Sequence, residues 1–300
     1  MLLSEQEDFT RTDRGSSAEA AIRGVSFVLH IEGKYESENV ETIRDYIFYK
    51  NLIDSLGFSA DIRIEGDCAS LMKESIRIGQ SDSTGHLFIF DRDHNEVMGV
   101  NRINSAYDFY TQGYSWENDF WTSSLLRAVI DSFCGDQDAI EACLLNFKDI
   151  ESTAKEYHKL NTLSRVNGKK IFDMGGTCNM PLTFSGGRCT FIQNCLTRLR
   201  NIWEGFNVQN DVKTVAANSF LTNNYYDHPG YLIQGHSYEY LVLEFIVKHS
   251  SSLKIVSSNN VCDKDMLRSI ATRAFIKSPT DILNPLTIQH YRDIFSTMAA

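Results

Sequence analysis

The sequence lacks any apolar run that approaches the roughly 20 residues needed by a membrane-spanning helix. It also starts with the acidic stretch Met1-Leu2-Leu3-Ser4-Glu5-Gln6-Glu7-Asp8, where a signal peptide would be basic. Both features argue against a membrane span and a secretory leader. We therefore expect a soluble globular protein of the cytoplasm that has no membrane partner.

Two chemical motifs are also missing. No G-x-x-x-x-G-K-[ST] segment occurs, which argues against nucleotide hydrolysis by a P-loop mechanism. The seven cysteines include no C-x-x-C pair, and their odd number argues against both a zinc site and a disulfide framework. The cysteines are therefore expected to be reduced and mostly buried.

Positive charge is scarce in the chain as a whole but concentrated in one segment. The net charge of −10 has the wrong sign for a protein that coats nucleic acid nonspecifically. Residues 146–200 differ, because they hold nine basic and four acidic side chains. A solvated helix face is one explanation of this segment. The other is contact with phosphates, for which Lys169 and Lys170 are the candidate substrate-binding residues.

The first half of the chain alternates between strand and helix patterns. Residues 1–20 are polar and aperiodic, which predicts a mobile N-terminal arm or a short cap. Apolar runs and helical spacing then predict a strand over 25–31, a helix over 42–56, a strand over 60–65, a helix over 69–78 and a strand over 86–90. This order is typical of a parallel α/β sheet flanked by helices.

The second half of the chain is predicted to be α-rich. Its helical patterns cover residues 120–133, 137–160, 190–203, 236–248, 263–275 and 287–298. A glycine-rich stretch within this half predicts an inserted loop or short hairpin over 170–190. The expected organisation is thus a metal-binding domain over 21–120 and an α-helical region over 121–300.

Three carboxylates mark the predicted ligand site. Ligands of parallel sheets bind beyond the carboxyl ends of the strands, and Glu32 and Asp91 each follow a predicted strand at that end. If the strand continues through Asp93, Asp91 and Asp93 point the same way and can hold one ion. The carboxylate oxygens of these acids are hard ligands, which favour Mg²⁺ or Mn²⁺. Glu32 is expected to act either as a ligand of this ion or as a general base.

These segments resemble a known family. The runs Ile31-Glu32-Gly33 and Phe88-Ile89-Phe90-Asp91-Arg92-Asp93 resemble a Toprim domain, the metal-binding fold of topoisomerases, primases and overcoming-lysogenization-defect nucleases. Three further segments resemble a narrower branch, the Toprim-like effectors of phage defence that are paired with ABC-type ATPases, such as the nuclease subunit of PARIS systems. They are Phe48-Tyr49, Tyr114-Ser115-Trp116-Glu117-Asn118 and Gln234-Gly235-His236. The resemblance is specific over residues 25–120 and loose afterwards.

The resemblance implies roles for individual residues. By position, Glu32 matches the catalytic glutamate, Asp91 and Asp93 match the metal-binding D-x-D, and Glu117 matches a further acid at the metal. The family also has an acid four residues after the glutamate, with an aromatic pair three residues beyond that acid. Glu36 fits the first spacing and Asp45 the second, so both are candidates, with Asp45 slightly favoured.

Two residues beside these acids are further candidates for substrate contact. His94 follows the D-x-D directly, and Lys34 follows Glu32-Gly33 closely enough to pair with a phosphate. A solvated surface role is the alternative for each of them.

The resemblance further implies a Mg²⁺-dependent endonuclease that acts as a toxin-like effector of antiviral defence. It implies cleavage of RNA such as tRNA, control by an ABC-type ATPase partner, and a Toprim-like core with helical additions. A homodimer is also expected. The alternatives are a non-catalytic regulatory or scaffolding subunit of an ATPase complex and a DNA-nicking nuclease.

Overall fold

The computed structural model describes residues 19–34, 39–80, 84–101, 103, 105–173, 180–225, 232–250, 253 and 262–298. The predicted mobile arm lies outside the described residues except at its end, where Glu19 and Ala20 open the short helix α2 (Glu19–Arg23) and are buried. The described chain forms two compact units. The first contains residues 19–90, 103–110 and 292–298, and the second contains residues 91–101 and 111–291. This division differs from the predicted boundary at residue 120.

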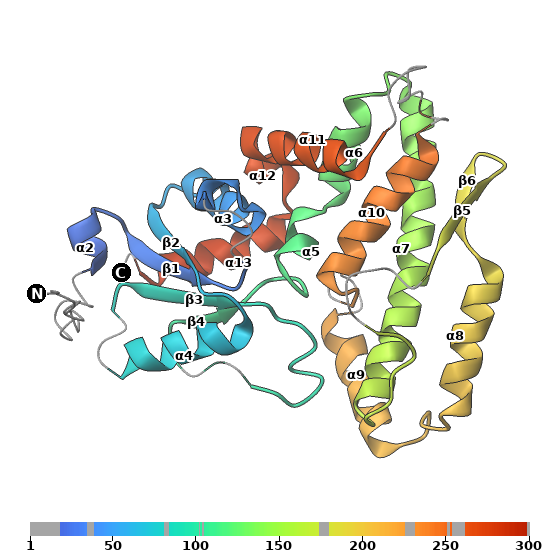
Figure 1. The fold of residues 1–300 in the computed structure, drawn as a ribbon, viewed down its shortest axis with the longest axis horizontal. Helices are drawn as coiled ribbons and strands as arrows, with labels where there is room; N and C mark the ends of the chain where they lie inside the picture. The colour runs from blue at the N-terminus through green and yellow to red at the C-terminus, as the bar shows by residue number, and fades with distance from the viewer. Residues whose placement is uncertain are drawn as a thin grey trace, which may run out of the picture. The chain divides into compact units, whose positions relative to one another are not determined.

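A four-stranded parallel sheet lies at the centre of the first unit. Its strand order is β2-β1-β3-β4, built from β1 (Phe27–Ile31), β2 (Ala60–Ile64), β3 (His86–Phe90) and β4 (Asp108–Tyr110). Every residue of β1 and β3 is buried, as expected for strands covered on both faces. The predicted α/β class, with a parallel sheet and an α-rich C-terminal region, is confirmed (Figure 1).

Helices α3 (Arg44–Ser55) and α4 (Cys68–Gly79) cover opposite faces of this sheet (Figure 1). The topology explains why. The chain steps from β1 to β2 in one direction and from β2 past β1 to β3 in the other, and right-handed crossovers then place their helices on opposite faces. On the α4 face, Leu71 and Ile78 pack against Phe88 and Phe90. The short 3₁₀ helix η1 (Val40–Thr42) precedes α3.

The second unit is mainly helical, as predicted. Its long helices α7 and α10 lie side by side, with the rings of Phe147 and Phe245 5.0 Å apart (Figure 1). The described helices of the C-terminal half are α5 (Trp116–Phe120), α6 (Ser123–Asp131), α7 (Gln137–Arg165), α8 (Gln193–Gly205), α9 (Val212–Tyr225), α10 (Gly235–His249), α11 (Lys264–Lys277), α12 (Pro279–Ile282) and α13 (Pro285–Ser296). The last part of α13, from Arg292, belongs to the first unit, where Phe295 stacks on Phe27.

Local signals refine two of the predicted segments. The helix expected over 120–133 corresponds to α6, which begins at Ser123 because the Thr122 side chain caps it by accepting a hydrogen bond from the Leu125 amide; Phe120 instead ends α5. The predicted 170–190 insertion contains an antiparallel hairpin of β5 (Leu182–Ser185) and β6 (Arg188–Phe191). Within the described residues, no helix is both long and apolar enough to cross a membrane.

Candidate active site

Glu32 and Asp91 follow neighbouring strands at the same edge of the sheet. Strands β1 and β3 are hydrogen-bonded in parallel, with Ile31 opposite Ile89. Glu32 is the residue after Ile31, and Asp91 follows Phe90, the last residue of β3. Both residues are half-buried. Sheet pairing therefore brings the backbones of these two acids to the carboxyl end of adjacent strands, the position where α/β folds bind ligands.

The Asp45 side chain lies against Gly33, the residue that follows Glu32 in the chain. A Cβ atom added to Gly33 would overlap the Asp45 Oδ2 and would lie 2.9 Å from Ile64 Cγ2. The carboxylate, in the first turn of α3, thus packs directly on the Gly33 backbone, and a side chain at position 33 would displace it. Of the two acids left open by the sequence, Asp45 lies against Gly33, the residue after Glu32. Glu36 lies outside the described residues.

The D-x-D segment has a different backbone from the one expected. Strand β3 ends at Phe90, and Asp93 adopts a left-handed conformation with φ of 50°. The expectation that an extended strand aligns Asp91 with Asp93 is therefore wrong. The segment is instead a turn held by hydrogen bonds to residues 111–114, in which the Asp93 amide donates to the Tyr114 carbonyl and the Arg92 Nε donates to the Thr111 carbonyl.

The charges of both aspartates nevertheless affect the pKa of one hydroxyl, that of Tyr114. Burial of Tyr114 first, then the negative charge of Asp93, and more weakly that of Asp91, raise the pKa of the Tyr114 hydroxyl well above its ordinary value. Asp93 also accepts a hydrogen bond from this hydroxyl. Asp93 therefore contacts this side chain from within the turn, although the strand geometry that was expected to align the two carboxylates is absent.

His94 is turned into the second unit and is buried. Its Nδ1 lies 3.1 Å from the Thr162 hydroxyl, and its ring meets Tyr114 edge-on at 4.7 Å. Burial, followed by repulsion from the protonated form of His158 and from Arg165, lowers the pKa of His94 to about 3. The imidazole is therefore neutral near pH 7, and these contacts make it a packing group of the D-x-D turn.

His158, on α7, is a second buried histidine, and burial lowers its pKa to about 3. In the unfolded chain this group has a pKa near 6.5. Below that pH the unfolded chain binds a proton that the folded protein does not bind, so the contribution of neutral His158 to stability is fully present above pH 6.5 and is lost as the pH falls toward 3. We expect the stability difference between pH 7.5 and pH 5 to be about 2 kcal/mol smaller in His158→Leu than in the wild type. Urea unfolding followed by circular dichroism measures this difference. His290→Leu, at a half-buried position, is the control, and an unchanged pH dependence in His158→Leu would contradict the prediction.

Glu117 lies in a buried polar cluster that joins α5 to α10. Only 2 % of the residue is exposed. The Ser115 hydroxyl donates to its Oε2 at 2.6 Å, and His236 Nδ1 lies 2.7 Å from its Oε1. Burial alone would raise the pKa of Glu117, but the hydrogen bonds and charge of His236, with Ser115, outweigh it and hold the pKa below its ordinary value. Glu117 is thus an ionised carboxylate with both oxygens engaged, and it orients a largely exposed imidazole.

Gly235 makes this cluster possible. A Cβ atom there would overlap the Ser115 hydroxyl and would lie 2.7 Å from Glu117 Oε2. The Asn118 side chain adds a further link between the two segments, because it donates to the Ile233 carbonyl at 2.9 Å. Ser115–Asn118 and Gln234–His236 were noted in the sequence as separate motifs, and the structure brings them together. The pairing of Glu117 with His236 was not predicted.

The three predicted substrate-binding lysines are exposed, and two have partners within the second unit. Lys169 donates to the Phe206 carbonyl at 2.9 Å and lies over the Phe206 ring. Lys170 pairs with Asp173. Lys34 lies two residues beyond Glu32 in the first unit. Phosphate binding by Lys169 or Lys170 would therefore have to compete with these local contacts.

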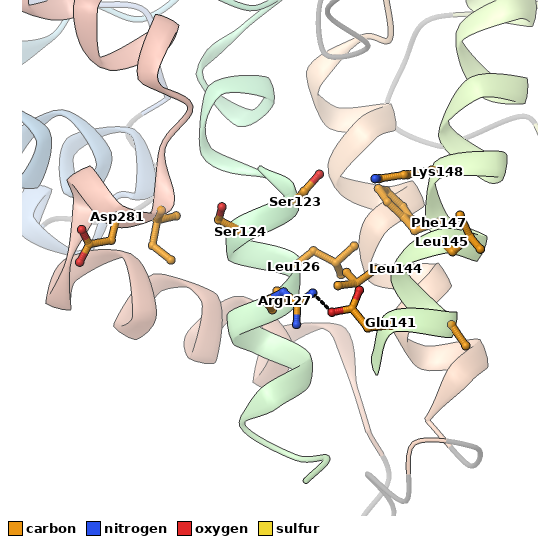
Figure 2. A pocket seen from close by; sticks show the side chains of 12 residues that line it. Ser123, Ser124, Leu126, Arg127, Glu141, Leu144, Leu145, Phe147, Lys148 and Asp281 are labelled. Carbon is orange, nitrogen blue, oxygen red and sulfur yellow. Dashed lines mark hydrogen bonds and ion pairs between the residues drawn. The ribbon is translucent and has the colours of Figure 1, made fainter. Parts of the chain in front are cut away.

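A surface pocket of about 700 Å³ lies between α6, α7 and α12, away from the predicted site residues (Figure 2). Its walls are largely apolar, and an ion pair between Arg127 and Glu141 crosses it. None of the described residues of the predicted site lines it, so we assign it no chemistry.

The described acids fall into two sets. Glu32 and Asp45 belong to the first unit, whereas Asp91, Asp93 and Glu117 belong to the second.

No protein-family model matches the chain, and no curated protein is detectably similar to it.

Proposed function

We propose that the protein is a Mg²⁺- or Mn²⁺-dependent endonuclease of the Toprim type, an effector of phage defence that cleaves RNA such as tRNA under the control of an ABC-type ATPase. The observation that carries this proposal is the pairing of β1 with β3. It sets Glu32 and Asp91 at the carboxyl ends of adjacent parallel strands. The substrate, the biological role and the partner follow from the sequence resemblance.

The side chains at this edge suit a hard divalent cation. Carboxylates offer only acceptor oxygens, and Mg²⁺ takes one or two of them together with water and substrate phosphate oxygens. By the sequence resemblance, Glu32, Asp91 and Asp93 would hold the ion, and Asp45, which packs on Gly33, is a further candidate. When bound, the ion would stabilise negative charge on the phosphate.

The residues of the chain have separable tasks in this proposal. Glu32 accepts a proton from the attacking water or hydroxyl, or ligates the ion. His236, held at Nδ1 by Glu117, presents an imidazole that is 65 % exposed and can donate to a phosphate oxygen. The Tyr114 phenol donates to Asp93 and fixes the orientation of that carboxylate.

Cleavage assays on the full-length protein test the proposal. Labelled tRNA and supercoiled plasmid are incubated with Mg²⁺, Mn²⁺ or a chelator, with and without the partner ATPase. We expect tRNA to be cut with either metal and to remain intact with the chelator. Plasmid nicking with intact tRNA would keep the metal-dependent nuclease but overturn the RNA substrate. Neither substrate being cut, even after release from the partner, would contradict the nuclease proposal and favour a scaffolding subunit.

A further inference from the structure

A histidine and two glutamates meet on the α4 face of the sheet in the first unit. His30 lies on β1, Glu65 follows β2, and Glu74 lies on α4. One ligand atom from each lies within 4.8 Å of the other two, and no other set of three His, Cys, Asp or Glu residues in the described parts of the chain is this close. The closest pair is His30 Nδ1 and Glu65 Oε1, at 2.6 Å.

The imidazole of His30 is held rigidly in place. The residue is fully buried, and its ring stacks on Phe88 with centroids 4.5 Å apart and an interplanar angle of 15°. Its Nε2 lies 3.0 Å from Nδ1 of the buried His86. Metal-binding histidines are characteristically fixed in this way, with the second ring nitrogen in a hydrogen bond that sets the tautomer. His30 therefore directs Nδ1 toward the two carboxylates.

The two glutamates form the outer side of the cluster. Their side chains are 22 % and 21 % exposed, so water and small ions can reach them. The hydrogen bond from Arg77 outweighs burial and lowers the pKa of Glu74. The Arg77 side chain is 59 % exposed, whereas Arg63, the other nearby cation, pairs with Glu19 and Asp61. Arg77 is thus the group that an ion at this cluster would have to displace.

We propose that His30, Glu65 and Glu74 bind one divalent transition-metal ion of the Zn²⁺ or Mn²⁺ class, with water in the remaining positions. One imidazole nitrogen with two carboxylate oxygens favours such ions over Mg²⁺, which prefers oxygen ligands alone. None of the three residues belongs to the acid set proposed for the nuclease, so this site does not rest on the proposed function.

The test is a binding experiment on the metal-depleted full-length protein in excess Mg²⁺, which occupies sites made only of oxygen ligands. Mn²⁺ binding is followed by electron paramagnetic resonance and Zn²⁺ binding by calorimetry, because Mn²⁺ binds thiols weakly and so separates this site from the cysteines. We expect one Mn²⁺ per chain, at least tenfold weaker binding in Glu65→Gln and Glu74→Gln, and unchanged binding in Asp54→Asn, a surface acid on α3.

Arg77→Ala distinguishes a metal site from a structural cluster. Removing the competing guanidinium should tighten Mn²⁺ binding several-fold, a change that a purely structural role would not produce. Circular dichroism of each variant checks that the fold is retained. The absence of Mn²⁺ and Zn²⁺ binding in excess Mg²⁺, or wild-type affinity in both glutamine variants, would overturn the site. These readouts do not depend on nuclease activity, so either proposal can fail alone.

Discussion

Glu32→Gln is expected to reduce metal-dependent cleavage of tRNA by about 1000-fold, a loss typical of removing a general base or a catalytic carboxylate. Glutamine keeps the size of the side chain and one of its two oxygens, but it neither takes up a proton nor carries a charge. Because Glu32 follows the last residue of β1, the paired strand should keep its register. Gel-based cleavage rates, with melting temperature as the measure of folding, check this expectation.

Glu41→Gln is the matched control for this experiment. Glu41 is an exposed acid of the same unit, in the short 3₁₀ helix before α3, and the same change in charge there should leave the cleavage rate unaltered. If Glu32→Gln cleaves at the wild-type rate, the carboxylate at the end of β1 is not catalytic. Full cellular activity of that variant would then favour the scaffolding alternative.

Gly235→Ala is expected to destabilise the second unit by about 3 kcal/mol. The added methyl group overlaps the Ser115 hydroxyl and crowds Glu117, both of which are buried. Relief of the overlap requires α5 and α10 to separate or the Ser115–Glu117 hydrogen bond to break, and a buried carboxylate that loses a donor costs more than the contact itself. The urea unfolding midpoint measures the loss.

Gly205→Ala is the matched control, and the same substitution there is expected to increase stability. Gly205 is the last residue of α8, and a Cβ atom there meets nothing within 4 Å. Alanine restricts the unfolded chain without a clash, so a gain of roughly 0.5 kcal/mol is expected. Equal effects of the two substitutions would show that the packing around Ser115 and Glu117 does not constrain residue 235.

Hydrophobic pattern was sufficient to predict the sheet but not all of its parts. The apolar runs that contain β1 and β3 predicted strands, and the structure confirms both strands and buries every one of their residues. Strand β4 was missed because its three residues, Asp108–Tyr110, are too few to show a period. Helix α9 was missed because its buried positions, Thr214, Ala217 and Leu221, include polar and small residues, while Val212 and Val215 are exposed.

The candidate site was predictable in its residue types but not in its geometry. Glu32 and Asp91 could be placed from strand ends alone, since sheet topology determines where those ends lie. The left-handed backbone of Asp93 has no sequence signal, because most Asp residues do not adopt it, although Asp does so more often than most other residues besides glycine. The Glu117–His236 pair joins residues more than one hundred positions apart, so only tertiary packing reveals it.

The strand order has a consequence for how the first unit folds. Strand β1 precedes both of its neighbours in the chain, and it pairs with β3 only after two crossovers, roughly 55 residues later. Loop closure over that distance is unfavourable until the intervening helices have formed. Strand β1 is therefore synthesised first but pairs with β3 late. During synthesis, one edge of β1 would stay exposed until β3 has been made.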